Sequence, residues 1–340
     1  MNPKKNHPRS LDAFSEANKP GRKRFDKRRG VQATRAQQQG VVIVMALLIV
    51  AIVAALSYSM LARLERDTRR TSLILRDTQA EFYAQGSIAW AIDQLRSNAE
   101  KAKPNQLVDL IPIKSPVNEV NGFKVESTIY DMQARFNVNS LMKPEAQVNF
   151  TRLLQLVDPK LTSEQAQAIT LATKDWMTPG ASQNEYASFY GELPVPYRPA
   201  HREIISISEL RLVKGMTAAL ANNLRPFVSA LPTNAAINVQ TAPAVVLAVL
   251  SPTMTLEAGR AIEAIRKSKP FNTLQAFSAL DVVKNHLIDS KSITILSNYF
   301  LVETIVTIEK QRLVIYTLLE RTGSNGKAAM NVLWQGKGTW

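Results

Sequence analysis

Residues 41–62 read VVIVMALLIVAIVAALSYSMLA and contain no charged side chain. As a helix, this stretch would be about 33 Å long, enough to cross the hydrocarbon core of a bilayer. A buried core helix is the first alternative, but the stretch is apolar on every face. A cleaved secretory signal is the second, but its apolar region would be shorter, and Ala55-Leu56-Ser57 is a poor cleavage site. The stretch therefore predicts a single transmembrane helix.

Residues 1–40 are strongly basic. They hold eleven Lys and Arg and only three acids, within a chain of 340 residues and net charge +14. Because they are also poor in large apolar side chains, we expect a disordered arm. Such arms bind nucleic acid or an anionic membrane surface. In front of an apolar helix, the positive charge holds the N-terminus in the cytoplasm. Everything after residue 62 then lies outside the cytoplasm, in the periplasm if the source is a bacterium.

The composition gives little support to catalysis. The chain has no Cys and only three widely spaced His. These counts exclude a disulfide framework, a Cys-ligated zinc site and a Cys nucleophile, and they disfavour a Ser-His-Asp triad. Paired carboxylates remain, but nothing in the sequence places Asp175, Glu185 or Glu192 around a pocket. We therefore predict no catalytic residue and no enzyme, and a periplasmic hydrolase is disfavoured.

The residue pattern predicts an α+β fold in which a large helical domain is inserted. Residues 63–100 continue the N-terminal helix, residues 101–119 with their three Pro read as a loop, and residues 123–130 read as a strand. Apolar alternation returns in residues 301–309, 313–319 and 328–334 as an antiparallel meander. The predicted domains are 1–40, 41–62, 63–141, 142–295 (the inserted helical domain) and 296–340.

Several helix starts are predicted within residues 142–295. Thr162 with Gln165, Ser206 with Glu209, and Asn272 with Gln275 have the spacing of capping boxes, and Thr241 with Pro243 is a fourth start. Two stretches, 208–217 and 237–271, are similar to helix-hairpin-helix units. DNA-binding versions use hairpin glycines to approach a phosphate, but here only Gly215 is present in one hairpin and Ser251-Pro252-Thr253 forms the other. We therefore favour a helical packing module over a DNA-binding one.

Gly40 lies at the boundary between the basic, Gln-rich arm and the apolar helix. Precursors of pilin-like proteins are cut after such a glycine, on the cytoplasmic face, by a dedicated peptidase. The same cut here would make residues 1–40 a leader and Val41 the first mature residue. Most pilins carry Glu at the fifth position after the cut, whereas this chain has Met45.

From Gln38 to its C-terminus the chain resembles the minor pseudopilin K family (general secretion pathway protein K) of bacterial type II secretion systems. The resemblance rests on the Gly40 junction without Glu at position five, on Arg135-Phe136-Asn137-Val138-Asn139-Ser140-Leu141, Asp175-Trp176, Tyr197-Arg198-Pro199-Ala200, the run from Ser206 to Met216, and Ile237-Asn238-Val239-Gln240-Thr241-Ala242-Pro243. It implies a pilin-like long helix and antiparallel sheet with a large all-helical insertion that contains helix-hairpin-helix-like repeats.

The resemblance also implies a non-enzymatic subunit at the tip of the pseudopilus, anchored in the inner membrane with its C-terminal domain in the periplasm. Members of the family join minor pseudopilins I and J, start assembly of the major pseudopilin G on the inner-membrane platform, and are processed by prepilin peptidase. No nucleic-acid partner is implied. A minor pilin of a type IV pilus and a membrane-tethered helix-hairpin-helix DNA-binding protein are the alternatives.

Met45 agrees with a position at the tip. Glu at position five is thought to neutralise the N-terminal amine of the neighbouring subunit ahead of it, and a subunit at the tip has none ahead. An unpaired carboxylate in hydrocarbon costs about 2.5–3.5 kcal/mol. The alternative is that Met45 is simply a lipid-facing residue.

Members of the family bind calcium through an acidic loop after Asp-Trp, so Asp175, Glu185 and Asn184 are the candidate ligands here. Calcium takes six to eight oxygen ligands. This chain has Met177, Thr178 and Pro179 where more carboxylates are usual, which should weaken or abolish the site. A plain surface loop is the alternative.

The Gly40 junction gives a direct prediction. The chain recovered from membranes should begin at Val41 when the cognate prepilin peptidase is present and should retain residues 1–40 when it is absent. N-terminal mass measurement distinguishes these products. An intact leader in both strains, or a cut beyond residue 55, would rule out pilin-like processing.

Overall fold

The computed structural model describes residues 30–101, 112–180, 185–323 and 329–338, without the side chains of 30–39, 99–101 and 185. It divides into two compact units, residues 1–73 and 74–340. The helix α1 (Gly30–Lys101) supplies all the described structure of the first unit. Its apolar side chains from Val41 to Leu61 are half to three-quarters exposed. By length and composition this helix is able to cross a membrane.

The second unit contains an antiparallel sheet in the order β1-β3-β8-β9-β10, with β2 also paired to β3. Its strands are β1 (Ile113–Lys114), β2 (Asn118–Val120), β3 (Phe123–Asp131), β8 (Tyr299–Ile308), β9 (Gln311–Thr322) and β10 (Ala329–Lys337). The strand predicted for residues 123–130 and the three strands predicted from alternation are confirmed. The loop predicted for residues 101–119 was wrong in its second half, because β1 and β2 lie there. Strands of two and three residues are too short for alternation to appear.

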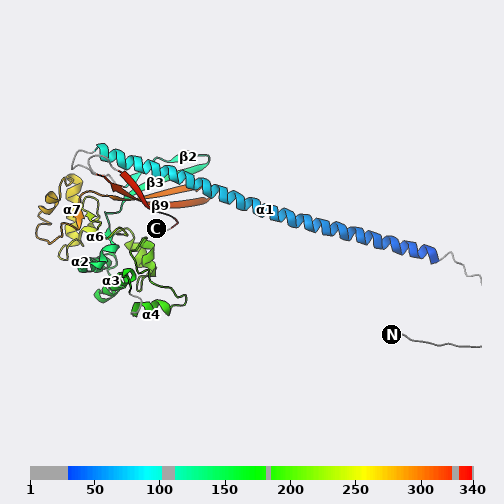
Figure 1. Cartoon of the computed structure of the whole chain (residues 1–340), viewed down its shortest axis with the longest axis horizontal. Helices are drawn as coiled ribbons and strands as arrows, with labels where there is room; N and C mark the ends of the chain where they lie inside the picture. Colours follow the sequence, from blue (N-terminus) through cyan, green and yellow to red (C-terminus); the bar gives the residue numbers. More distant parts are fainter. Residues whose placement is uncertain (1–29, 102–111, 181–184, 324–328, 339–340) are drawn as a thin grey trace, which may run out of the picture. The chain divides into compact units, whose positions relative to one another are not determined.

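The part of α1 that belongs to the second unit packs along one face of this sheet (Figure 1). Its buried residues recur every three or four positions: Ala80, Ala84, Ile88, Ala91 and Leu95. The alanines allow close approach to the strands, where Phe123, Ile129 and Val302 lie in the same clusters. At the surface, Lys337 of β10 pairs with Asp77 at 3.2 Å.

Between β3 and β8 the chain forms two helical modules, each closed by a parallel ladder of two residues. Module 1 comprises residues 136–229: β4 (Phe136–Asn137), η1 (Val138–Met142), α2 (Pro144–Val157), α3 (Ser163–Met177), α4 (Glu185–Gly191), η2 (Ile207–Leu212), α5 (Ala218–Leu224) and β5 (Val228–Ser229). Module 2 comprises residues 237–294: β6 (Ile237–Asn238), α6 (Ala244–Leu247), α7 (Leu256–Ser268), α8 (Leu274–Ser278) and β7 (Ile293–Thr294).

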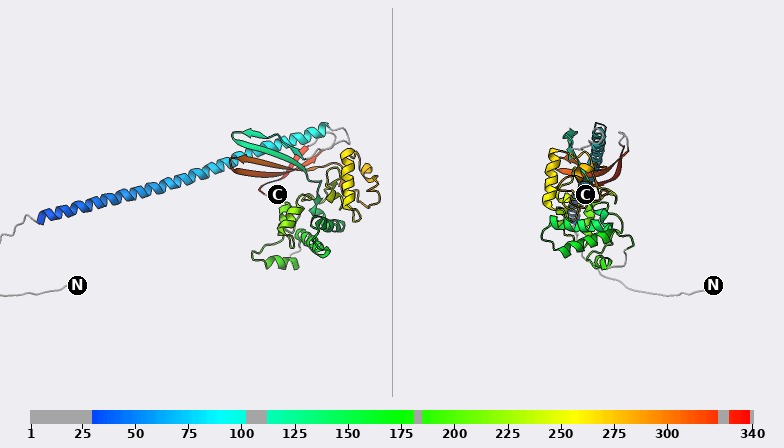
Figure 2. Two further views of the ribbon diagram at one scale, coloured as in Figure 1. Left: turned by 180° about the vertical axis from the view of Figure 1, so that it is seen from behind. Right: turned by 90° about the vertical axis from the view of Figure 1, so that its left-hand side faces the viewer.

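Each module has its own hydrophobic core. Phe150, Leu154 and Leu210 are among the buried residues of module 1, and Leu247, Ile262 and Phe277 are among those of module 2. Figure 2 shows module 2 (yellow) beyond one end of the strands and module 1 (green) beside the sheet. Leu301 and Leu318 of the sheet join the core of module 1. The predicted long helix, antiparallel sheet and inserted helical region are therefore confirmed.

The helix starts test the predicted caps. The boxes Thr162–Gln165 and Ser206–Glu209 both form, the second at the start of the 3-10 helix η2. The box Asn272–Gln275 was wrong. Thr273 caps α8 instead, and its side chain accepts a hydrogen bond from the Ala276 amide. Both Asn and Thr are good N-caps, so residue type alone does not decide between neighbouring positions.

Gly259 sets how closely α6 and α7 pack. A Cβ atom at this position would lie 2.3 Å from the carbonyl oxygen of Ala244, which is backbone and has no freedom to turn away. The absence of a side chain at Gly259 is therefore what lets the two short helices of module 2 touch.

The sheet, the segment that leads into module 1 and the start of module 2 meet at the buried carboxylate of Asp131, the last residue of β3. Its Oδ1 accepts a hydrogen bond from the Gln133 amide at 2.8 Å. Its Oδ2 accepts bonds from Asn238 Nδ2 at 3.2 Å, Ser297 Oγ at 2.6 Å and the Thr241 hydroxyl. Donors from the start of module 2 and from the segment before β8 thus share one acceptor.

Gln133 extends this junction. Its Oε1 accepts from the Asn298 amide at 2.5 Å, and its Nε2 donates to the Ala236 carbonyl at 2.7 Å. Burying an ionised carboxylate is costly unless hydrogen bonds replace its hydration. Here side chains and amides from separate segments do so, and their positions become interdependent.

Replacing Asp131 by Asn should destabilise the fold by about 3 kcal/mol or more, because a shared acceptor becomes an amide group and charge-assisted bonds are lost. Urea unfolding of the full chain in detergent, followed by tryptophan fluorescence, measures this. Asp281→Asn is the matched control, since that carboxylate is 90% exposed and meets only Lys284. Equal unfolding midpoints for the two variants would contradict the role of the junction.

Candidate functional site

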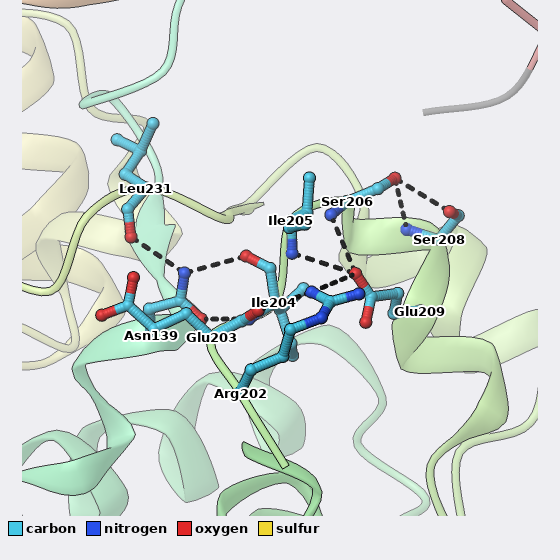
Figure 3. Close-up of polar contacts among 9 residues, drawn as sticks. All are labelled: Asn139, Arg202, Glu203, Ile204, Ile205, Ser206, Ser208, Glu209 and Leu231. Atoms are coloured by element: carbon cyan, nitrogen blue, oxygen red, sulfur yellow. Dashed lines mark hydrogen bonds and ion pairs between the residues drawn. The ribbon is translucent and has the colours of Figure 1, made fainter. Parts of the chain in front are cut away.

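The stretch Arg135–Leu141 holds module 1 together through two buried asparagines. Asn139 Nδ2 donates to the carbonyls of Ile204 at 3.0 Å and Leu231 at 2.9 Å, and its Oδ1 accepts from the Ile204 amide at 2.9 Å (Figure 3). Asn137 Oδ1 accepts from the Leu231 amide at 3.0 Å, and its Nδ2 donates to the Pro232 carbonyl at 2.9 Å. These side chains replace the backbone pairing that the irregular segments lack.

The stretch from Ser206 to Met216 begins with the capping box of η2. Glu209 Oε1 accepts from the amides of Ile205 at 2.9 Å and Ser206 at 3.2 Å (Figure 3). Arg202 lies 3.8 Å from the same oxygen. The carboxylate is thus used to begin the helix, and it is only partly exposed. This arrangement positions η2.

The first hairpin, between η2 and α5, is covered by other parts of module 1. Lys214 Nζ lies 4.9 Å from the ring centroid of Phe189, and its amide donates to Tyr190 Oη at 2.9 Å. Gly215 has a φ of 84°, and a Cβ there would lie 3.0 Å from Ile169. Burial raises the pKa of Tyr190 to about 12, so its hydroxyl stays neutral at physiological pH.

The second hairpin, between α6 and α7, is bound by module 1. Arg152 of α2 donates to the carbonyls of Ser251 at 2.5 Å and Met254 at 2.6 Å. The Thr253 hydroxyl contacts His286 Nδ1 at 2.7 Å. Both hairpins therefore contact protein groups at positions where DNA-binding versions contact phosphate, which favours the packing interpretation.

The predicted processing and assembly residues lie on α1. Gly40 and Val41 are helical and exposed, and a Cβ at Gly40 would meet nothing within 4 Å. The side chain of Met45 is 59% exposed. An unpacked apolar surface suits contact with lipid or with neighbouring helices.

Of the three predicted calcium ligands, only Asp175 has a described side chain. Asp175 is half-buried near the end of α3, Glu185 begins α4 but its side chain is not described, and Asn184 lies outside the described residues. The carbonyls of Trp176 and Thr178 already contact His201, through its amide at 2.8 Å and its Nδ1 at 3.1 Å. No group of three His, Cys, Asp or Glu suited to a metal occurs in this part of the chain. Calcium binding stays a prediction.

Comparisons with known proteins all point to the same protein family. The family models described as type II secretion system (T2SS), protein K match residues 134–233 and 237–295. The type II secretion system protein K of Pseudomonas aeruginosa is 30% identical over 331 residues, which cover 89% of this chain and 95% of that protein. The chain belongs to the type II secretion system protein K family. The protein K of Klebsiella pneumoniae is 31% identical over 263 residues, covering 71% of this chain and 79% of that protein.

A solved structure supports the same protein K family. A chain in the crystal structure of the GspK-GspI-GspJ complex from the type 2 secretion system of enterotoxigenic Escherichia coli matches with a TM-score of 0.67 and 25% identity. The match covers 80% of this chain and all of that chain. The two regions matched by the family models, 134–233 and 237–295, coincide closely with modules 1 and 2. The parallel ladders are therefore the structural limits of these regions.

Sequence reasoning missed the residues that join the parts of this chain. Asp131, Gln133 and Arg152 contact residues about 100 or more positions away. A local pattern carries no signal for such pairs. The only available hint was that Asn238 and Thr241, two of the donors to Asp131, lie in a stretch that resembles the family.

Replacing Asn139 by Ala should destabilise the protein by about 3 kcal/mol, because it leaves two carbonyls and one amide without their partner in the interior of module 1. The apparent melting temperature of the full chain in detergent measures the loss. Asn223→Ala, at an exposed position of α5, is the matched control and should leave stability unchanged. A similar melting temperature for both variants would show that Asn139 is not required.

Proposed function

We propose that this protein is a non-catalytic subunit at the tip of the type II secretion pseudopilus, which starts assembly with minor pseudopilins I and J and caps the fibre of major pseudopilin G. The observation that carries the proposal is the match to a chain of the GspK-GspI-GspJ complex over 80% of this chain and all of that one. A chain that shares this fold along its length has the surfaces for the same assembly.

The anchor is the uncharged run of 22 residues from Val41 to Ala62 in α1. Prepilin peptidase removes residues 1–40 on the cytoplasmic side of the inner membrane. The basic leader keeps the N-terminus in the cytoplasm, so the second unit is delivered to the periplasm. Export of folded periplasmic proteins is the process that this subunit serves.

Met45 supports a position at the end of the fibre. A subunit within a fibre uses a carboxylate at position five to pair with the amine of the neighbour ahead, whereas Met45 cannot form such a pair. The absence of that charge lets this subunit enter hydrocarbon first, without an unpaired carboxylate.

The two modules support the capping role. They add about 160 residues at the point where β3 ends and β8 begins. Their bulk blocks the addition of a further subunit above this one, while the sheet and α1 keep the surfaces through which a pilin-like subunit joins its partners below.

The structure allows a clean test of capping. The amide of Met132 donates to the carbonyl of Tyr299 at 3.0 Å, and Asp131 is paired with Phe300. Residues 133–298 can therefore be replaced by an Asn-Gly turn that joins β3 and β8 as a hairpin. When the major pseudopilin is overproduced, this variant should give longer or more numerous fibres, counted by electron microscopy.

Recovery of minor pseudopilins I and J with the variant from membranes shows that it still assembles. Fibres of unchanged number and length, in cells where I and J are recovered, would refute the blocking role.

Met45 is tested in the full chain with the same fibre count. Met45→Glu should lower the number of fibres and Met45→Leu should not, because only the Glu variant places a carboxylate in hydrocarbon.

A further inference from the structure

A small pocket opens between η2 and α5 in module 1. Its volume is about 30 Å³, and Ile207, Leu210, Ala221 and Val228 form its apolar walls. All four belong to helices or a strand of the module, so the pocket is part of the folded framework and not of a loop. It has room for a group of a few atoms.

Arg211 and Arg225 line the same pocket. Arg211 Nη2 donates to the side-chain oxygen of Asn222 at 2.6 Å, so it reaches from η2 to α5. Arg225 is half-buried, and its Nη2 donates to the Tyr316 hydroxyl at 3.3 Å. Both acceptors are neutral. Neither arginine forms an ion pair with any carboxylate in the described part of the chain.

The nearby carboxylates are used elsewhere. Glu209 accepts from the amides at the start of η2 and lies near Arg202. Glu303 accepts from the hydroxyls of Tyr130 at 3.1 Å and Tyr316 at 3.0 Å. Neither of these acids neutralises the pocket directly.

A third arginine adds to the positive charge. Arg135 Nη1 donates to the backbone carbonyl of Arg225 at 3.3 Å. Burial, together with the charge of Arg225, lowers the pKa of Arg135 to about 10. Arg135 remains protonated at neutral pH, and the carboxylates of Asp131 and Glu303 partly offset its charge.

The shape of the pocket selects among anions. Guanidinium groups bind carboxylates through paired, charge-assisted hydrogen bonds. The apolar walls suit the methylene groups of an acidic side chain. A nucleic-acid backbone would instead need a stripe of cations matched to successive phosphates.

We propose that this pocket receives the side-chain carboxylate of a glutamate or aspartate from a partner protein, held between Arg211 and Arg225. The proposal uses the proposed function only in placing the chain within a multi-protein assembly. Arginine clusters of this kind are a general means of recognising acidic segments.

The test uses the full chain in deuterated detergent and ligand-observed NMR. The probe is the peptide N-acetyl-Gly-Glu-Gly-amide, compared with its Gln analogue and with inorganic phosphate. We expect saturable binding of the Glu peptide and at least about tenfold weaker binding of the Gln peptide, because one charge-assisted pair accounts for a factor of this size.

Asn222→Asp is the decisive variant because it preserves shape. It places a carboxylate beside Arg211, where the amide oxygen now lies at 2.6 Å, so the chain itself pairs with this arginine in place of the ligand. Binding of the Glu peptide should fall at least about tenfold, with the urea unfolding midpoint retained. Arg211→Gln, at an exposed position, should have the same effect, and Lys267→Gln in α7 should have none.

Equal binding of the Glu and Gln peptides, full binding by both Asn222→Asp and Arg211→Gln, or tighter binding of phosphate than of the Glu peptide would each overturn the proposal. The last result would indicate a site for a small free anion. Because this assay needs neither fibres nor the other pseudopilins, its failure would leave the proposed function standing. Fibres that are unchanged by deletion of the modules would likewise leave this proposal standing.

Discussion

The buried carboxylate of Asp131 accepts hydrogen bonds from segments on both sides of the inserted modules. β3 ends at this residue, module 2 begins with Asn238, and the chain returns to the sheet just after Ser297. Asp131 ends a long strand and Asn238 ends a strand of only two residues, so regular backbone pairing stops at the junction. The need to hydrate or pair a buried charge fixes all of these segments at once. The sheet and the inserted region are therefore connected through hydrogen bonds at one junction and not by flexible linkers.

The two modules are joined to one another in the same way, by charged side chains that bind backbone carbonyls. Arg152 of module 1 donates to the second hairpin, and within module 2 Arg266 donates to the carbonyls of Val239 at 2.9 Å and Ala242 at 2.6 Å. Turns without glycine leave carbonyl groups in need of donors, and a guanidinium group supplies several in a fixed plane. In this chain, the hairpins of the helix-hairpin-helix-like units are thus used for internal packing.

Features that repeat along the chain were predictable from the sequence. The membrane helix follows from 22 uncharged residues, the strands from alternation, and the capping boxes at Thr162 and Ser206 from a spacing of three. Features that depend on distant contacts were not. β1 and β2 are too short to show a period, and Asp131, Arg152 and Arg225 find partners far along the chain. Of the predicted calcium ligands, only the side chain of Asp175 lies in the described part of the structure, so residue type alone still supports that site.

The pairing of β3 with β8 has a consequence for folding kinetics. Ser127 and Thr304 contact each other across 177 positions, whereas each module is closed by contacts within its own segment. The entropic cost of closing the long loop falls once the modules have become compact, because they then shorten the effective distance between the strands. We therefore expect the modules to form first and the sheet last. During synthesis, one edge of β3 therefore stays unpaired until nearly all of the polypeptide has been made.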